Sequence, residues 1–354
     1  MREKKSKKKD LELLYQLYTY RVLSTPQIAR IGGYGKWYVY KKVKRLEEKG
    51  YIHIEQISGR YIPDQNRQGN YYRITGNGIA LLKKNGYLVD ATADELRVSK
   101  YRLPYLLTFN ELAISLEERG WETNNSRNLK KFYNLNRGDV IQGSLLSPSK
   151  DKEYAVYIFL KSVVGDTLAR IKSEIDRNPL DDVLVLTRGI DSFKAVVNSF
   201  AGMDNEKERL IKSGSIKVLP FQFAKSYLPL SNDNRKVHKS FLTELGLEVL
   251  GDHTSKIFST NVKMDYVVRH EGEEKYFVDL LDNDLMKIDE VIRYHREDYK
   301  RDGRKVLALT SPIAAHQEFH KQILGNIPHI EYLFVDPNEV IQFSYLQSSQ
   351  QKPF

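Results

Sequence analysis

Two aspartates in the last third of the chain have a spacing that could bind a divalent metal ion. Asp265 begins a predicted strand, and Asp279 ends the next strand about one hairpin later. Carboxylates at such neighbouring positions are typical ligands of Mg²⁺ or Mn²⁺, and the bound ion can activate water for attack on a phosphodiester. Lys287, on the helix that follows, could supply a cation to the same site. The pattern makes a metal-dependent nuclease or nickase one alternative function. Asp282 and Asp284 are interpreted instead as the loop and N-cap of that helix.

A second group of residues, near the start of the chain, has the chemistry of a nucleic-acid contact. A predicted helix over residues 34–49 places Val39, Val43 and Leu46 on one apolar stripe. Its other positions are basic or aromatic, as a helix in the major groove requires. The predicted DNA-binding residues are Lys36, Trp37, Tyr38, Lys41, Lys42, Lys44 and Arg45 of this helix, with Arg60 and Arg67 of the loop that follows. Lys42, Arg45 and Arg60 are expected to contact phosphates.

The charge distribution agrees with a polyanionic partner for the same region. The first hundred residues hold 21 lysines and arginines against 10 acidic residues, whereas the remainder holds 35 against 36. All of the net charge of +10 therefore comes from the N-terminal part of the chain. The lysine-rich segment 1–9 is predicted to be a disordered arm that adds phosphate contacts and salt dependence.

The elements that position the basic helix follow from periodicity and capping. A helix is predicted over 10–22, and Ser24 followed by Pro26 predicts the N-cap and first turn of a short second helix. The basic third helix ends at Gly50, and two strands follow over 51–57 and 71–75. A closing helix is predicted over 77–86. Three helices and a two-stranded wing are the order of a winged helix-turn-helix domain over residues 10–87.

The segment KWYVYKKVKRLEEKGYI (36–52), followed by YYRITGNGIALL (71–82), resembles the recognition helix, wing and last helix of MarR- and PadR-like winged helices. The shared features are a basic run, a leucine, a Lys-Gly pair and a wing that closes on a Thr-x-x-Gly turn, here Thr75 to Gly78. The resemblance implies binding to duplex DNA. Many winged helices contact proteins instead, and a charged run can simply be a solvated helix face.

In the rest of the chain, one α/β order of predicted helices and strands occurs twice. We predict a linker over 88–103, a first α/β domain over 104–230, a second over 231–346 and a tail over 347–354. Paired landmarks are Asp139 with Asp265, Val156 with Val278, and VLVLT (183–187) with VLALT (306–310). The fold class is therefore α+β and α/β, with a winged helix before two tandem α/β domains. Duplication is one explanation of the pairing, and convergence on a common β-α-β pattern is the other.

The second copy, with Asp265 and Asp279 on neighbouring strands, is similar to the core of PD-(D/E)xK nucleases. That resemblance implies metal binding by Asp265 and Asp279. The sequence departs from the motif at two places, because Met264 precedes Asp265 and Leu281 stands where the lysine is expected. In the first copy, Tyr157 falls where Asp279 would be, so that copy is predicted to be catalytically inactive.

The whole layout, with MDYVV (264–268) and EKYFVDLLDND (274–284), resembles the plasmid replication-relaxation family. This resemblance implies a role in replication, its control or DNA transfer on a plasmid or other mobile element. We expect a sequence-specific, non-enzymatic protein that binds double-stranded DNA. The metal-dependent nuclease and a transcriptional repressor remain the alternatives.

Other expectations concern partners and further chemistry. A homodimer that spans two half-sites is predicted, with replication or transfer proteins as other partners, no membrane partner and a cytoplasmic location on the nucleoid or plasmid. No cofactor is expected, and Mg²⁺ or Mn²⁺ enters only under the nuclease alternative. The chain has no cysteine, which excludes a thiolate metal site and a cysteine nucleophile. His316 and His320, four residues apart, are predicted to lie on a solvated helix face.

Overall fold

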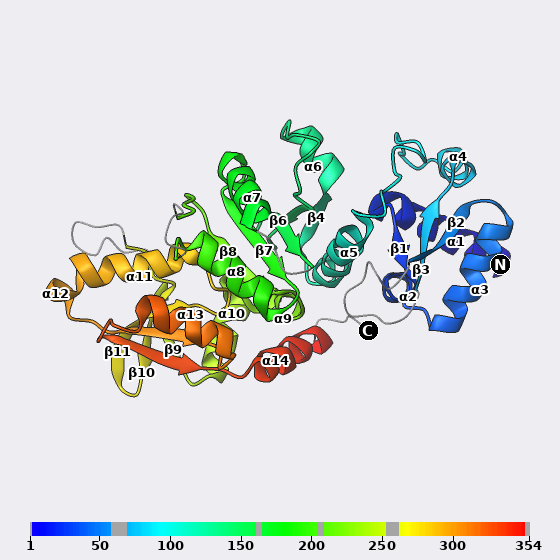
Figure 1. Ribbon diagram of the computed structural model, residues 1–354. Helices are drawn as coiled ribbons and strands as arrows, with labels where there is room; N and C mark the ends of the chain where they lie inside the picture. Colours follow the sequence, from blue (N-terminus) through cyan, green and yellow to red (C-terminus); the bar gives the residue numbers. More distant parts are fainter. Residues whose placement is uncertain (1, 58–68, 161–164, 204–208, 253–261, 351–354) are drawn as a thin grey trace. The chain divides into compact units, whose positions relative to one another are not determined.

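The protein is described by a computed structural model that covers residues 2–57, 69–160, 165–203, 209–252 and 262–350. The chain divides into two compact units, an N-terminal unit that ends at Ser115 and an α/β unit that begins at Leu116. Each unit has its own sheets and core (Figure 1). Among the described residues, no helix has the length and apolar character needed to cross a membrane.

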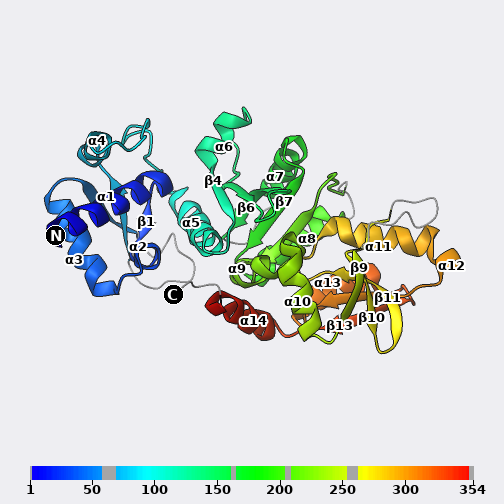
Figure 2. The same cartoon turned by 180° about the vertical axis from the view of Figure 1, so that it is seen from behind.

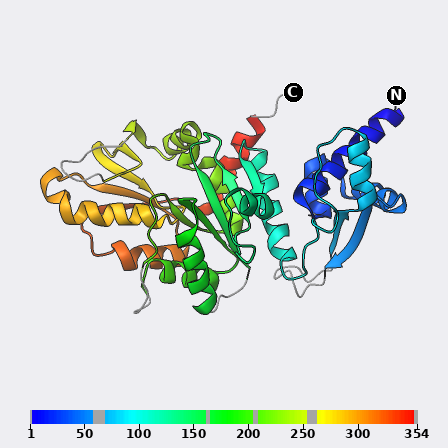
Figure 3. The ribbon, with the colours of Figure 1, turned by 90° about the horizontal axis from the view of Figure 1, so that it is seen from above.

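The N-terminal unit combines helices with one small sheet, which Figure 3 shows from above in blue and cyan. Its three-stranded sheet has the order β1-β3-β2, with antiparallel pairing throughout. The predicted helices and strands between residues 10 and 86 are confirmed, with ends shifted by a few residues. Its elements are α1 (Arg2–Tyr20), β1 (Leu23–Ser24), α2 (Thr25–Gly32), α3 (Lys36–Glu48), β2 (Ile52–Ile57), β3 (Gly69–Ile74), α4 (Gly76–Lys84) and most of α5 (Leu103–Glu117).

Two local signals in this unit form the contacts that the sequence suggested. The side chain of Gln27 accepts a hydrogen bond of 2.9 Å from the backbone N–H of Ser24, which closes the first turn of α2. Thr75 caps α4 by accepting from the backbone N–H of Gly78 at 3.2 Å. A Cβ atom on Gly78 would lie 2.4 Å from the carbonyl oxygen of Tyr51, so only glycine fits this turn.

Two expectations about the edges of this unit differ from the structure. The lysine-rich segment, predicted to be disordered, is the first part of α1, since Lys and Glu favour helix and extend the helix that follows. The predicted linker 88–103 is held against α1. Tyr18 accepts hydrogen bonds from the backbone N–H groups of Asp90 and Ala91 at 2.9 and 2.8 Å. Asn110 of α5 donates to the carbonyl of Val22 at 2.6 Å, which attaches this helix to the same unit.

The α/β unit begins with a five-stranded sheet of order β4-β5-β6-β7-β8. The first three strands are antiparallel, and β6, β7 and β8 are parallel. Figure 1 shows α7 and α8 beside its strands. The strands are β4 (Glu122–Asn125), β5 (Gly143–Leu146), β6 (Glu153–Phe159), β7 (Asp182–Thr187) and β8 (Ile216–Pro220), and the helices are α6 (Ser126–Phe132), α7 (Gly165–Arg177), α8 (Ile190–Phe200) and α9 (Phe221–Tyr227), with the 3₁₀ turns η2 (Leu228–Leu230) and η3 (Asn232–Asn234).

A second five-stranded sheet follows, and Figure 2 shows this part of the chain from behind. The sheet has the same strand order and the same strand directions as the first. Its order is β9-β10-β11-β12-β13, antiparallel up to β11 and parallel from there on. The strands are β9 (Glu248–Asp252), β10 (Tyr266–His270), β11 (Glu273–Asp279), β12 (Val306–Thr310) and β13 (Ile330–Phe334), and the helices are α10 (Arg235–Glu244), α11 (Leu285–Glu297), α12 (Tyr299–Asp302), α13 (Ala314–Leu324) and α14 (Pro337–Gln350).

One hydrophobic core contains residues of both sheets, so the two halves are not separate domains with separate cores. It includes Tyr157 of β6 and Val278 of β11, together with Phe193 of α8 and Phe319 of α13. The predicted fold class, α+β and α/β, is confirmed. The segment GDVIQG (138–143) predicts a strand, whereas β5 begins only at Gly143. The edge strands β4, β8, β9 and β13 were not predicted, because their short length gives little periodicity.

Candidate functional site

The outer face of α3 carries most of the predicted DNA-binding residues. Lys36, Trp37, Tyr38, Lys41 and Lys44 are exposed, and the side chain of Trp37 is 81% exposed. The opposite face is buried through Val39, Val43 and Leu46, as predicted from their spacing. The indole of Trp37 lies edge-on to the ring of Tyr40, at a centroid distance of 6.3 Å. The helix therefore presents ammonium groups and one large aromatic surface on the same side.

Two predicted phosphate contacts of α3 point instead toward α1. Lys42 is only 3% exposed, and its Nζ lies 2.8 Å from the carboxylate of Asp10. The guanidinium of Arg45 donates to both oxygens of the same carboxylate, at 2.7 and 2.8 Å. The reason lies in the helical spacing, because Lys42 falls within the inward stripe between Val39 and Leu46. Lys42 is thus a buried structural cation, and the expectation that it contacts phosphate is wrong.

The two predicted residues of the loop between β2 and β3, Arg60 and Arg67, lie outside the described residues. The strands on either side are described, and they hold an ion pair of their own. Arg73 donates to the carboxylate of Glu55 at 2.6 Å across the β2–β3 pair. The base of the loop is therefore fixed by strand pairing.

In the α/β unit, the structure brings together the three residues that were predicted as a metal or catalytic site. The backbone N–H of Asp279 donates to Asp265 Oδ2 at 2.8 Å. The Nζ of Lys287 lies 3.1 Å from Asp265 Oδ2 and donates to the carbonyl oxygen of Asp279 at 3.0 Å. Asp284 caps α11, which places Lys287 in the first turn with its side chain directed back toward the end of β11.

The carboxylate of Asp279 is fully buried and has protein partners on both oxygens. Oδ2 accepts from the hydroxyl of Tyr227 at 2.7 Å and lies 3.0 Å from His238 Nε2. Oδ1 accepts from the backbone N–H of Leu281 at 2.9 Å. Burial raises the pKa of Asp279, but the His238 hydrogen bond and the nearby Lys287 outweigh it and lower the pKa below its ordinary value. The group is a buried, fully hydrogen-bonded anion.

These contacts do not suit a divalent metal between Asp265 and Asp279. A metal ligand needs a free lone pair directed at the ion, and the Asp279 carboxylate directs its oxygens to Tyr227, His238 and Leu281. The Lys287 ammonium already lies against Asp265. Across the described residues, no cluster of three or more His, Asp or Glu side chains has the geometry to hold a metal ion. The carboxylates of this site are held in hydrogen bonds and ion pairs, so they offer no open coordination position to a metal ion.

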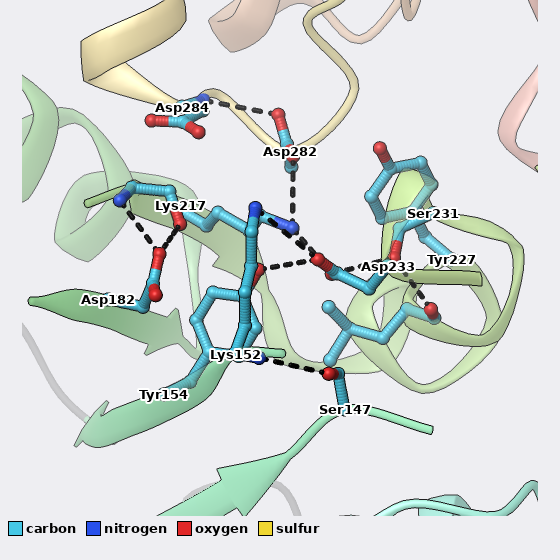
Figure 4. A network of polar contacts seen from close by, with 12 residues as sticks. Ser147, Lys152, Tyr154, Asp182, Lys217, Tyr227, Ser231, Asp233, Asp282 and Asp284 are labelled. Atoms are coloured by element: carbon cyan, nitrogen blue, oxygen red, sulfur yellow. Dashed lines mark hydrogen bonds and ion pairs between the residues drawn. The ribbon is translucent and has the colours of Figure 1, made fainter. Parts of the chain in front are cut away.

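The ionic cluster extends further than the sequence indicated, and it joins the two sheets (Figure 4). Lys217 of β8 is fully buried and lies 2.7 Å from Asp233 Oδ2 and 3.5 Å from Asp282 Oδ2. Asp282 lies equally far, 3.5 Å, from Nζ of Lys287. The backbone N–H of Val218 donates to the carbonyl of Asp282 at 2.9 Å, so the edge strand of the first sheet is attached to the loop after β11.

Burial and the neighbouring charges together set the pKa of two groups in this cluster. It raises the pKa of Asp282 to about 6, although the ammonium groups of Lys287 and Lys217 oppose the rise. For Lys217 the desolvation would lower the pKa, but the neighbouring carboxylate of Asp233 outweighs it and raises the pKa above its ordinary value. Lys217 is therefore a charged lysine in the interior, and Asp282 is the carboxylate whose charge is least well compensated.

Sequence reasoning missed Lys217, Asp233 and His238 as members of the cluster. Lys217 stands inside the apolar strand IKVLP (216–220), and a lysine in such a run was the available signal of a buried cation. Asp233 and His238 come from turns and helices far from β11 in the sequence. Their meeting with Lys217 and Asp279 depends on tertiary packing, which periodicity does not reveal.

The corresponding position of the first sheet contains a different set of residues. Asp139 lies four residues before β5, and it accepts from Arg177 at 2.6 Å. Tyr157 of β6 is buried and accepts from the amide of Asn178 at 3.2 Å. The prediction that Tyr157 stands where the second sheet has Asp279 is wrong by one residue. The strand pairs Ile158–Leu186 and Asp279–Leu309 make Ile158 the counterpart of Asp279, whereas Tyr157 and Val278 both face the shared core.

His316 and His320 of α13 were predicted to be solvated, and the structure shows the opposite. Each is only 1% exposed, and the ring of His316 stacks on Phe193 with a centroid distance of 4.7 Å. His320 Nδ1 lies 2.8 Å from the hydroxyl of Thr310. Burial lowers the pKa of His316 to about 4 and that of His320 to about 3. They are neutral core residues, because α13 packs this face against α8.

Residues 14–176 match the model of a family described as replication-relaxation, which supports the resemblance to that family over just under half of the chain. The matched region includes the N-terminal unit from α1 onward and the first sheet as far as α7. No curated protein and no solved structure matches the chain.

Proposed function

We propose that the N-terminal unit is a winged helix that binds duplex DNA, with α3 in the major groove. The supporting order is α1, β1, α2, α3, β2, β3 and α4, in which α2 and α3 are joined by a short turn and β2 and β3 form the wing. The net charge of the first hundred residues, 21 basic against 10 acidic, supplies the attraction to phosphate.

The exposed face of α3 is the observation that carries this proposal. An 81% exposed tryptophan contributes nothing to a core, and it stands beside the exposed Lys36, Lys41 and Lys44. Such a surface suits a partner that offers both anions and apolar groups, and the major groove offers phosphates, base edges and thymine methyl groups. Lys42 and Arg45 hold α3 against α1 through Asp10, so they fix the orientation of the exposed face of α3.

We further propose that DNA binding serves replication, its control or transfer of a plasmid or other mobile element. The match of residues 14–176 to the replication-relaxation family supports this process. A homodimer would set two α3 helices on two half-sites, and replication or transfer proteins are the further partners. The α/β unit would be a non-enzymatic platform, because the carboxylates of its nuclease-like position are engaged by Tyr227, His238 and Lys287.

The test is selection of bound fragments from the DNA of the host element, followed by affinity measurements on the selected site at several salt concentrations. Lys41→Ala with Lys44→Ala should weaken binding at least about tenfold and reduce the slope of log K against log salt by about 1.8, since each lost phosphate contact removes about 0.9. The matched control is Lys83→Ala with Lys84→Ala on α4, which removes the same charge from exposed positions. Equal losses in both pairs would contradict a specific role for α3.

The same site, in supercoiled plasmid with Mg²⁺ or Mn²⁺, separates this proposal from its alternatives. We expect the DNA to remain uncut. Nicking that disappears in Asp279→Ala would make the α/β unit a nuclease and overturn the platform proposal. A selected site that lies in a promoter, with no effect on replication or transfer when it is deleted, would favour the transcriptional repressor.

A further inference from the structure

Three oxygen atoms from three different groups surround the ammonium of Lys287. Asp279 contributes its backbone carbonyl at 3.0 Å, Asp265 its Oδ2 at 3.1 Å, and Asp282 its Oδ2 at 3.5 Å. Asp282 is fully buried and Asp265 has a side chain that is only 9% exposed. Two carboxylate oxygens and one carbonyl oxygen around a single cation are the kind of donor set that hard divalent cations prefer.

We propose that Lys287 is a built-in cation that occupies a divalent-cation cage formed by Asp265, Asp282 and the carbonyl of Asp279. In the native chain, the ammonium neutralises the cage and closes it to ions from solution. Removal of the ammonium would create a site for Mg²⁺, Mn²⁺ or Ca²⁺. The site is distinct from the metal position predicted from the sequence, because it uses the carbonyl of Asp279 while the carboxylate is held by Tyr227 and His238.

An independent observation at Asp282 points to the same cage. Asp282 Oδ2 is buried, and within the described part of the chain no donor gives it a hydrogen bond. It faces only the two ammonium groups of Lys217 and Lys287, each at 3.5 Å, which is longer than a normal ionic hydrogen bond. Metal–oxygen distances are about 2.0–2.6 Å, so a small ion could approach this oxygen more closely than a lysine stem allows.

Charge balance explains why a lysine can stand in for an ion at this place. The Lys287 ammonium lies 3.1 Å from Asp265 Oδ2 and 3.5 Å from Asp282 Oδ2, so a single positive charge faces two carboxylates. The residue also stands in the first turn of α11, where the helix dipole disfavours a positive charge. The position of the Lys287 ammonium is therefore set by Asp265 and Asp282, because the helix dipole alone would disfavour a lysine in this turn.

The experiment compares the native chain with Lys287→Ala, which opens the cage, and Lys287→Arg, which keeps a cation in it. Each protein is titrated with Mn²⁺, Mg²⁺ and Ca²⁺ by calorimetry, and its unfolding temperature is measured with millimolar cation and with chelator. We expect Mn²⁺ to raise the unfolding temperature of Lys287→Ala by roughly 5 °C or more and to leave the native chain and Lys287→Arg unchanged. Adding Asp282→Asn to Lys287→Ala should remove most of that gain.

Several results would overturn the proposal. One is a Lys287→Ala protein whose stability does not respond to any of the three cations. Another is native protein that binds Mn²⁺ as tightly as the variant. If Lys287→Ala does not fold in chelator, it is refolded with Mn²⁺, and failure there counts against the cage as well. No DNA is present in these measurements, so their outcome is independent of the proposed winged-helix function.

Discussion

The two sheets of the α/β unit have one topology and two different ways to fill the same position. On the third strand, the first sheet has Ile158, a buried apolar residue, where the second has Asp279, a buried carboxylate with three partners. Near the second strand, Asp139 pairs with the half-exposed Arg177, whereas Asp265 pairs with Lys287, which is only 14% exposed. The two sheets therefore differ in charge and in burial of that charge.

This difference shows that the strand order does not need a buried carboxylate at this position. The first sheet has the same five-strand order with an isoleucine there. A buried ion pair contributes little net stability compared with apolar residues of similar volume, but losing one partner is costly. Asp279 and its partners are therefore a source of specificity and vulnerability, and mutations in the two sheets should measure this directly.

The largest effect is expected from Asp279→Ala. The change leaves Tyr227, His238 and the nearby Lys287 without the buried anion that pairs with them, so the free energy of unfolding should fall by about 3–5 kcal/mol. Tyr157→Phe, on the third strand of the first sheet, removes a neutral hydroxyl that is hydrogen-bonded to Asn178 and Glu174 and should cost only about 1–2 kcal/mol. Urea unfolding followed by circular dichroism gives both values. Similar losses in the two variants would remove the distinction between the sheets.

An intermediate and opposite effect is expected from Asp282→Asn, because this carboxylate is poorly compensated. Its pKa is about 6 in the folded state and 3.8 when unperturbed, so the folded state retains a proton that the unfolded chain releases between pH 4 and 6. The charged form therefore costs stability progressively as pH rises through that window. At about 1.4 kcal/mol per pKa unit, the asparagine variant should be more stable at pH 7.5 by at most about 3 kcal/mol.

The pH dependence distinguishes this cause from altered packing. The stability difference between Asp282→Asn and the native chain should approach zero near pH 4, increase up to pH 6 and then remain constant. Unfolding curves at five pH values across this range provide the measurement. A difference that is already present at pH 4, or a variant that is less stable at pH 7.5, would show that the ion pairs of Asp282 outweigh its desolvation.

How much of this could be predicted from the sequence depends on the range of the interactions. Helical periodicity located α3 and its inward stripe, and the spacing of His316 and His320 placed both on one helix, which is α13. The Asp265, Asp279 and Lys287 group was also found, because its members lie within one strand–strand–helix segment. A local sequence pattern is sufficient to predict a side-chain contact wherever the two residues belong to consecutive helices or strands.

The errors concern partners that are distant in the chain. Lys42 was expected to face DNA, but its anion, Asp10, lies 32 positions earlier on α1. Lys217 and Asp282 meet because β8 and the loop after β11 pack together, and His316 is buried because α13 covers α8. The sequence around a charged or polar residue looks the same whether its side chain is exposed to solvent or is buried and paired with a partner. Only the tertiary contact distinguishes the two.

The smallest effect is expected at Asp139, the carboxylate that precedes the second strand of the first sheet. Its ion pair with Arg177 involves a side chain that is 48% exposed, and exposed pairs contribute about 0–1 kcal/mol. Asp139→Asn retains an oxygen that can accept from the backbone N–H of Asn136, so the free energy of unfolding should fall by less than about 1 kcal/mol. The loss should shrink further in 1 M salt, which screens exposed charges. Asp265→Asn, measured in parallel, should lose more and respond less to salt, because its partner Lys287 is only 14% exposed. Equal losses and equal salt responses at the two positions would mean that burial of the cation does not separate the two sheets.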